Sequence, residues 1–311
     1  MNYKKLIAPE LKRAAKRVPY NRAIIRCANL YQTISLRLTA IPKKVRNRQI
    51  QVEGYKELLC KIDIFEPANA QEKLPCLLYF HGGAFSYKAS AYHKKLACIY
   101  AIAANCRVFF PDYHLAPRYP FPAAYEDGLA VYKYMMRNAE ELAINKERIG
   151  LAGDSAGACL AALLCNHYEQ EGLAKPCLQM LIYPATDAAM LTDSMKRFTD
   201  TPLWNSKNNQ RMWSYYCKDL KAEERHKAAP MHSSLPQIIP DTYIEAAEYD
   251  CLHDEGILYG EKLREAGARV TINETKGTIH GYDVNLHTSI AIRNIEERIA
   301  FLRSGFSSLS L

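Results

Sequence analysis

Short apolar runs alternate along the chain with longer segments whose apolar residues recur at helical spacing. This alternation is typical of βαβ units, in which helices cover both faces of a mostly parallel sheet. The apolar runs predict strands at 76–80, 106–110, 148–153, 177–183, 241–249 and 268–274. The helical patterns lie near 91–104, 122–139, 155–170, 254–266 and 288–303.

Two more features complete the predicted architecture. The stretch before residue 66 predicts two antiparallel strands, about 49–54 and 57–65, which bring the sheet to eight strands. Residues 1–45 and about 186–230 interrupt the alternation with helical patterns, and Asn205 has the character of a helix N-cap. We therefore expect an α/β fold with two helical segments laid over its sheet.

The length and composition indicate a globular protein. The chain has 311 residues, enough for one large domain or two modest ones, and 49% of them are apolar. No apolar run reaches the ~20 residues of a membrane span, and the basic N-terminus has no apolar core of a secretory signal. The sequence therefore predicts a cytoplasmic protein without stable membrane insertion.

The ten cysteines indicate neither a disulfide framework nor a metal site. They are scattered, with no C-x-x-C pair and no histidine spacing that suits zinc. Several lie in apolar runs, where a reduced cysteine behaves as a small hydrophobic residue. We expect free thiols, no metal ion and no cofactor.

The net charge of +8 has a local origin, because lysine and arginine crowd the first fifty residues. Binding to nucleic acid or to an anionic membrane surface would explain this clustering. No nucleic-acid motif accompanies the charge, so we favour the solvated face of N-terminal helices and expect no nucleic-acid partner. A surface-binding role for this segment stays open beside any other function.

The segment LAGDSAGACLAALL (151–164) contains the first candidate for chemistry. It places Ser155 between Gly153 and Gly157, where a predicted strand becomes a helix. A turn this tight forces its central residue into strained backbone angles, and residues two positions away must lack side chains. Because the helix N-terminus also favours developing negative charge, Ser155 is predicted to be a nucleophile.

A serine nucleophile requires a base and a carboxylate that orients the base. Asp250 follows one predicted strand and His280 follows the next, in the chain order serine, acid, histidine of α/β hydrolases. We predict that these two residues act with Ser155. The weaker candidates lie in or beside predicted helices: His167, His253, Asp254, Glu255 and His287.

A glycine-containing loop supplies candidates for binding an oxyanion. His81, Gly82, Gly83 and Ala84 follow directly after a predicted strand. The N–H groups of Gly82 or Gly83 and of Ala84, with that of Ala156, are predicted to converge on a developing negative charge. We expect His81 to hold this loop in place rather than to transfer protons.

From about residue 74 to its end, the chain resembles the hormone-sensitive-lipase-like branch of α/β-hydrolase esterases. The motifs HGGAF, DYHLAPRYPFPAAYED (112–127), GDSAG, LIYPATD, EYDCLHDEG and GTIHGYD occur in the family's order and spacing. The resemblance implies the α/β-hydrolase fold and a Ser155–Asp250–His280 triad. It also implies a catalytic domain of residues 49–311 and a helical cap made by residues 1–48 and the insertion 186–230.

The chain departs from that family's pattern at four positions. The family has a third glycine where Ala84 stands, which adds a methyl group beside the acyl site. His114 and Arg118 replace an arginine and a glutamate, which puts a usual ion pair in doubt, and Cys251 replaces a proline. None of these changes removes a predicted catalytic group.

These observations predict a cofactor-free serine carboxylesterase that acts on small, short-acyl esters through an acyl-enzyme. An amidase or peptidase using the same triad is one alternative. A non-catalytic protein that binds a small molecule on the same fold is the other, because relatives of this branch include hormone receptors that lack the triad. The expected partner is a small-molecule ester, and a homodimer stays open.

Overall fold

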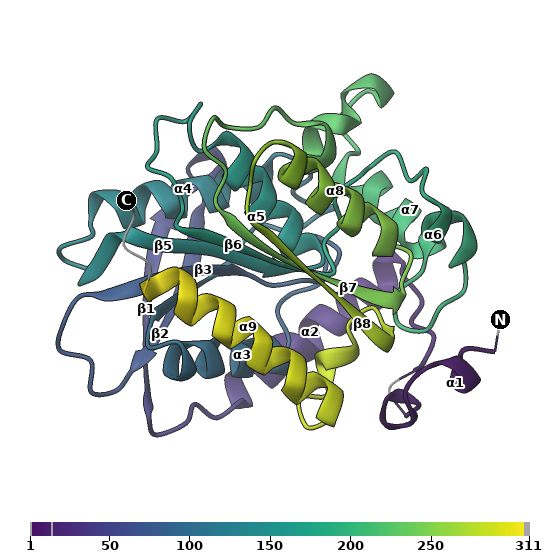
Figure 1. The fold of residues 1–311 in the computed structure, drawn as a ribbon, viewed down its shortest axis with the longest axis horizontal. Coiled ribbons are helices and arrows are strands. Elements are labelled where there is room, and N and C mark those ends of the chain that lie inside the picture. The colour runs from purple at the N-terminus through teal and green to yellow at the C-terminus, as the bar shows by residue number, and fades with distance from the viewer. Residues whose placement is uncertain (1, 14, 308–311) are drawn as a thin grey trace.

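The computed structural model describes residues 2–13 and 15–307. Its centre is one eight-stranded sheet with the order β1-β2-β4-β3-β5-β6-β7-β8 (Figure 1). β2 is antiparallel to both of its neighbours, β1 and β4, and the remaining pairs are parallel. The strands are β1 Val45–Glu53, β2 Leu59–Pro67, β3 Leu74–Phe80, β4 Arg107–Asp112, β5 Ile144–Asp154, β6 Leu178–Ile182, β7 Asp241–Tyr249 and β8 Val270–Ile279.

Helices cover both faces of this sheet, as predicted. α3 (Ala91–Ala103) and α9 (Ser289–Ser307) lie on one face (Figure 1). The other face carries α4 (Ala123–Arg137), α5 (Ala156–His167) and α8 (His253–Glu265). Each of these helices begins within one residue of its predicted start, and the predicted fold class is confirmed.

The N-terminal prediction is wrong in two respects. Helix forms at α1 (Tyr3–Leu6), η1 (Pro9–Leu11) and α2 (Arg22–Leu38), but residues 15–20 are not helical. Pro19 accounts for part of this break, because a proline disfavours helical angles in the residue before it. β1 begins at Val45, so the boundary predicted after residue 48 falls inside a strand. Only two of the nine residues of this edge strand, Val45 and Val52, are buried, so its apolar pattern is weak.

The segment 186–230 contains α6 (Asp193–Arg197), α7 (Ser206–Tyr216) and η3 (Ala222–Ala228), and it ends at the first residue of η4 (Pro230–His232). The side chain of Asn205 accepts a hydrogen bond from the N–H of Asn208, so the predicted N-cap is confirmed. This segment touches the N-terminal one, because Arg17 pairs with Asp200 at 2.9 Å.

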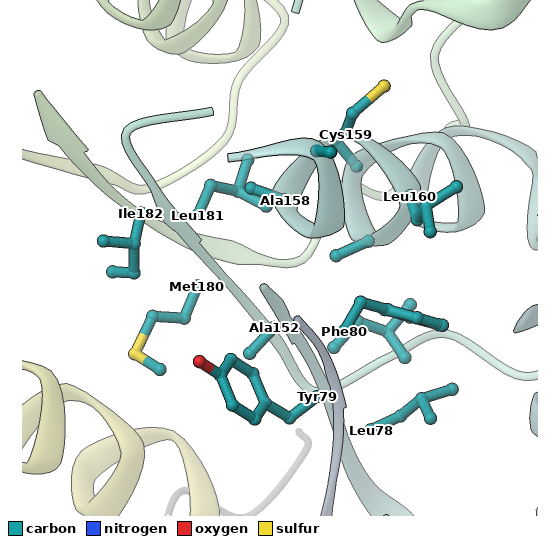
Figure 2. Packing of buried hydrophobic residues seen from close by; sticks show 14 of the residues in the cluster. Leu78, Tyr79, Phe80, Ala152, Ala158, Cys159, Leu160, Met180, Leu181 and Ile182 are labelled. Atoms are coloured by element: carbon teal, nitrogen blue, oxygen red, sulfur yellow. The ribbon is translucent and has the colours of Figure 1, made fainter. Parts of the chain in front are cut away.

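Helix α5 is buried from Ala156 to Asn166 against the centre of the sheet. It is apolar on all sides and rich in alanine, as expected of a helix that solvent does not reach. Figure 2 shows Leu181 and Phe80 on the side of the sheet that faces α5, with Tyr79 and Met180 directed away from it. This packing fixes the junction between β5 and α5.

The described residues can be checked for a membrane-spanning helix, a metal-binding group and disulfide bonds. No helix there is long and apolar enough to cross a membrane. Within the same residues, no group of three His, Cys, Asp or Glu is placed to hold a metal ion. All ten cysteines are free, and eight of them are buried. Burial raises the pKa of thiols such as those of Cys159 and Cys165 well above the ordinary range, so these thiols are neutral.

Candidate active site

Ser155 lies on the turn between β5 and α5 with a φ of 55° and a ψ of −118°. A Cβ atom on Gly153 would lie 2.3 Å from the carbonyl carbon of Gly157. A Cβ atom on Gly157 would lie 2.1 Å from the carbonyl oxygen of Phe80. Any side chain at either position would push backbone segments apart, and this is the steric requirement predicted from the sequence.

The structure brings Ser155, Asp250 and His280 together. Oγ of Ser155 lies 2.9 Å from Nε2 of His280, and Nδ1 of that ring lies 2.6 Å from Oδ2 of Asp250. With its proton on Nδ1, the neutral imidazole donates to the carboxylate and accepts from the serine hydroxyl. The three residues follow β5, β7 and β8, so the carboxyl ends of parallel strands assemble the group.

The weaker candidates make other contacts. Oδ2 of Asp254 accepts a hydrogen bond from the N–H of Ser194 at 2.7 Å, and His253 lies 2.8 Å from the other oxygen of Asp254. Nδ1 of His167 lies 3.2 Å from the hydroxyl of Tyr125, on a different part of the surface. His287 is exposed. None of the contacts named here involves Ser155.

Glu255 departs from the surface role expected of the first turn of a helix. It is fully buried, and its Oε1 accepts hydrogen bonds from the N–H groups of Thr186 and Asp187 at 2.7 and 3.3 Å. Burial raises its pKa well above the ordinary value of 4.5, which favours the neutral carboxylic acid. Glu255 thereby ties α8 to the start of the segment 186–230.

We expect Glu255→Gln to gain stability over the wild type as the pH rises. Because the folded-state pKa of Glu255 is raised, its carboxyl group stabilises the folded state fully below about pH 4.5. This stabilisation declines as the pH rises through the folded-state pKa. The decline is at most about 1.4 kcal/mol per pH unit, and glutamine does not undergo it. Urea unfolding of both proteins over a pH series measures the difference. Parallel pH curves would contradict this assignment.

The loop after β3 places Gly82, Gly83 and Ala84 beside the Ser155 turn. Gly83 and Ala84 line one cavity with Ser155, and their φ angles are 121° and 56°. In the described part of the chain, the N–H groups of these three loop residues and of Ala156 donate no hydrogen bond. They are therefore not committed to another acceptor among these residues. Alanine adopts this left-handed φ at a cost of about 1 kcal/mol.

His81 is fully buried behind this loop. Its Nδ1 lies 2.6 Å from the carbonyl oxygen of Gly82, and its ring stacks on Tyr113 with 4.4 Å between centroids. Burial, together with the nearby His93, lowers the pKa of His81 to about 4, so the ring is neutral in solutions near neutrality. These contacts agree with a role in holding the loop.

Asp154 has a role that the sequence pattern does not reveal. Its Oδ1 accepts a hydrogen bond from the Tyr79 hydroxyl at 2.9 Å, and its Oδ2 lies 3.1 Å from Nε2 of His93. Burial opposes the charged form, but His93 and these hydrogen bonds hold the pKa of Asp154 below its ordinary value. The backbone of Gly82 packs directly against this carboxylate, because a Cβ atom on Gly82 would lie 2.3 Å from Oδ2 of Asp154. Asp154 therefore holds the serine turn and the glycine loop in contact.

A buried ionic network supports His280 from the other side. The edge of Tyr183 packs on the His280 ring with 4.7 Å between centroids, and the Tyr183 hydroxyl donates to Asp283 at 2.7 Å. Arg298, from α9, pairs with Asp283 at 2.7 Å and with Glu245 at 2.6 Å. The separation of these residues in sequence explains why no local motif predicts the network.

A cavity of about 180 Å³ opens on Ser155 and His280. One side of it is formed by the glycine loop and by Tyr87, Tyr92 and Tyr183. The other side comes from the two segments that interrupt the α/β alternation: Val18, Tyr20, Leu203, Trp204 and Asn208. The rings of Tyr20 and Trp204 meet edge to face at 5.4 Å, so the two segments close this side together.

Comparison with known proteins identifies the family. Residues 77–284 match the model of a family described as having the alpha/beta hydrolase fold. The chain belongs to this family. In the matched region, Nδ1 of His114 contacts Oδ2 of Asp127 at 2.8 Å, while Arg118 lies over the ring of Tyr119.

Relatives within the alpha/beta hydrolase family are named esterases. Carboxylesterase NlhH of Mycobacterium tuberculosis is 29% identical over 77% of this chain and 75% of its own. The ethyl acetate hydrolase of Pseudomonas putida is 31% identical over 66% of this chain and 65% of its own. The solved structure of a bacterial heroin esterase is 30% identical and covers 98% of this chain and 99% of its own, with a TM-score of 0.88. These similarities place the chain among carboxylic ester hydrolases.

Proposed function

We propose that this chain is a serine carboxylesterase in which Ser155 is the nucleophile, His280 the general acid and base, and Asp250 the carboxylate that orients His280. The observation that carries the proposal is the hydrogen-bonded sequence from Ser155 Oγ through His280 to Asp250 at the wall of a cavity. The named esterase relatives support the reaction class.

In the acylation step, Oγ of Ser155 attacks the ester carbonyl carbon while Nε2 of His280 accepts the hydroxyl proton. The carbonyl oxygen becomes an oxyanion, which the N–H groups of Gly82 or Gly83, Ala84 and Ala156 stabilise. Asp250 stays ionised and stabilises the imidazolium. The imidazolium then protonates the leaving alkoxide, which departs as the alcohol and leaves an acyl group on Ser155.

In the deacylation step, a water molecule takes the place of the alcohol. Nε2 of His280 accepts a proton from this water as its oxygen attacks the acyl carbon, and the same N–H groups stabilise the second oxyanion. The intermediate collapses, and the proton on His280 returns to Ser155 Oγ. The products are a carboxylic acid and the free enzyme, and no cofactor takes part.

The size of the cavity supports small, short-acyl esters as substrates. Pockets for drug-sized ligands have volumes of about 300–1,000 Å³, and the cavity on Ser155 has about 180 Å³. Its walls include the rings of Tyr20 and Trp204, from segments that we propose form a cap. The similarity to an ethyl acetate hydrolase supports the same substrate class.

A series of nitrophenyl esters of increasing acyl length tests this substrate class. We expect the highest kcat/KM between acetyl and hexanoyl esters, because longer chains exceed the enclosed volume. Trp204→Ala should shift the optimum to longer chains, since it removes a ring from the wall. Faster turnover of emulsified long-chain triglyceride than of soluble short esters would contradict the assignment.

Ala84→Gly tests the oxyanion loop. We expect kcat to change by less than about tenfold, because the N–H donor is retained, whereas loss of a donor costs about 10²–10³. The variant should also be about 1 kcal/mol more stable, since glycine adopts a φ of 56° without strain. Steady-state kinetics and urea unfolding measure the two effects. An increase in kcat of about a hundredfold on every ester would mean that Ala84 turns its N–H away from the site.

A further inference from the structure

Helix α2 (Arg22–Leu38) packs Ile25 into the core but also carries a row of apolar residues on its solvent side. On the inner side, Asn29 donates to the carbonyl oxygen of Ser86 at 2.9 Å and accepts from the N–H of Lys88 at 2.8 Å. On the outer side, the exposed fractions are 67% for Leu30, 71% for Tyr31, 52% for Ile34 and 79% for Leu38. Burial in this fold therefore explains Ile25 but not these four exposed residues.

The exposed residues Leu30, Tyr31, Ile34 and Leu38 form one stripe, which we call the α2 stripe. Their spacings of three and four residues place them on one side of the helix. A contiguous apolar patch with a polar rim marks an interaction surface in a soluble protein. An apolar helix face flanked by basic residues is the arrangement of helices that lie in a membrane interface.

The positive charge of the protein lies in the same segment. Residues 1–45 hold eleven lysine and arginine residues and one acidic residue, Glu10, for a net charge of +10. The other 266 residues carry a net charge of −2. Three of the cations, Arg22, Arg26 and Arg37, are exposed on α2 itself. The entire net positive charge therefore lies in the segment that contains the α2 stripe.

A basic groove runs beside α2. It has a volume of about 790 Å³, and its acidic lining is limited to Asp112, which lies 4.0 Å from Lys88. The cationic side chains that line it are Arg22, Arg26, Lys61, Lys88, Arg118 and Lys218. Such a groove suits phosphate oxygens, which lysine and arginine bind by charge-assisted hydrogen bonds.

We propose that α2 docks this protein on a lipid surface with anionic headgroups. The α2 stripe would enter the boundary between headgroups and acyl chains, while the exposed Arg26 and Arg37 of the same helix bind phosphates beside it. A second copy of the chain fits this surface poorly, because two segments of +10 would face each other. Nucleic acid would satisfy the cations but leave the aliphatic stripe uncovered.

Docking would also bring the reaction cavity close to the lipid, and this consequence rests on the proposed esterase function. Tyr31 of the α2 stripe lines a groove of about 450 Å³ that extends to Gly83 and Tyr92. Both of these residues also line the cavity on Ser155. The groove beside the α2 stripe and the reaction cavity are therefore neighbours, so docking would place esters dissolved in the lipid near the nucleophile.

Sedimentation of the full chain with vesicles tests the docking. Phosphatidylcholine vesicles are compared with vesicles that also contain phosphatidylglycerol. We expect at least about tenfold tighter binding to the anionic vesicles and weaker binding at high salt. The triple variant Leu30→Ser/Ile34→Ser/Leu38→Ser should bind at least about tenfold more weakly than the wild type. The matched control is Leu191→Ser/Ile238→Ser/Leu258→Ser, with the same substitutions at exposed sites elsewhere.

A charge variant completes the design. Arg26→Gln/Arg37→Gln should lose binding to anionic vesicles, whereas Lys146→Gln/Lys175→Gln should not. No binding to anionic vesicles at low salt, or equal losses in stripe and control variants, would overturn the proposal. A dimer that the stripe variant dissociates, or tighter binding to duplex DNA than to the vesicles, would also overturn it. All variants should keep wild-type activity on a soluble acetyl ester, so failure of the esterase function would appear there and not in sedimentation.

Discussion

Ser155→Ala is expected to lower kcat for a soluble acetyl ester by roughly four to six orders of magnitude. The substitution removes the atom that forms the acyl-enzyme but leaves the cavity and the glycine loop in place. His280→Ala should lose a similar factor, because the 2.9 Å contact of its Nε2 with Ser155 Oγ is the route for the proton. The double variant should be little slower than either single one, since the groups act as a unit.

A matched control for this prediction is Ser86→Ala. Ser86 is also a buried serine near the site, and its Oγ accepts a hydrogen bond from Tyr20 at 2.7 Å, away from His280. It should keep kcat within about tenfold of the wild type. Ester hydrolysis by Ser155→Ala above about a tenth of the wild-type rate would refute the assigned nucleophile.

Arg298→Leu is expected to destabilise the protein by about 3–5 kcal/mol. Arg298 is 1% exposed, and it neutralises two buried carboxylates, those of Glu245 and Asp283. Without the guanidinium, both acids must stay charged in the interior or take up protons. Urea unfolding measures the loss, and the same variant should raise KM or lower kcat because Asp283 also anchors Tyr183 against His280.

Arg303→Leu on the same helix is the control for this prediction. Its guanidinium is exposed and donates to the carbonyl oxygen of Ala103, so its loss should change stability by no more than about 0.5 kcal/mol. Similar losses of unfolding free energy in the two variants would show that the buried ionic network of Arg298 contributes no more than a surface contact.

The alternation of apolar runs and helical patterns predicts the central sheet well because its strands are covered on both faces. β3, residues 149–153 of β5 and, apart from Gln179, β6 consist of apolar residues and glycine, and α5 begins directly after the Ser155 turn. The glycines around Ser155 can be recognised in the sequence because the steric requirement for them acts within only five residues, 153–157. The start of β1 at Val45 is harder to predict, because an edge strand with exposed side chains has a weak apolar pattern.

Long-range polar contacts are the features that the sequence does not reveal. Arg298 meets Glu245 across 53 positions, and Glu255 meets the backbone of Thr186 across 69. Each residue alone looks like an ordinary charge on a helix or strand. Their burial depends on the packing of α8 and α9 against the sheet, which no local pattern records.

Labelling with a fluorophosphonate, followed by mass spectrometry of the peptides, tests the central claim most directly. The reagent transfers its phosphonyl group to an activated serine oxygen. We predict one label per chain, on Ser155, with esterase activity lost in proportion to the labelled fraction and no label on Ser155→Ala. A label on another residue, or full activity in a chain whose Ser155 is modified, would contradict the account.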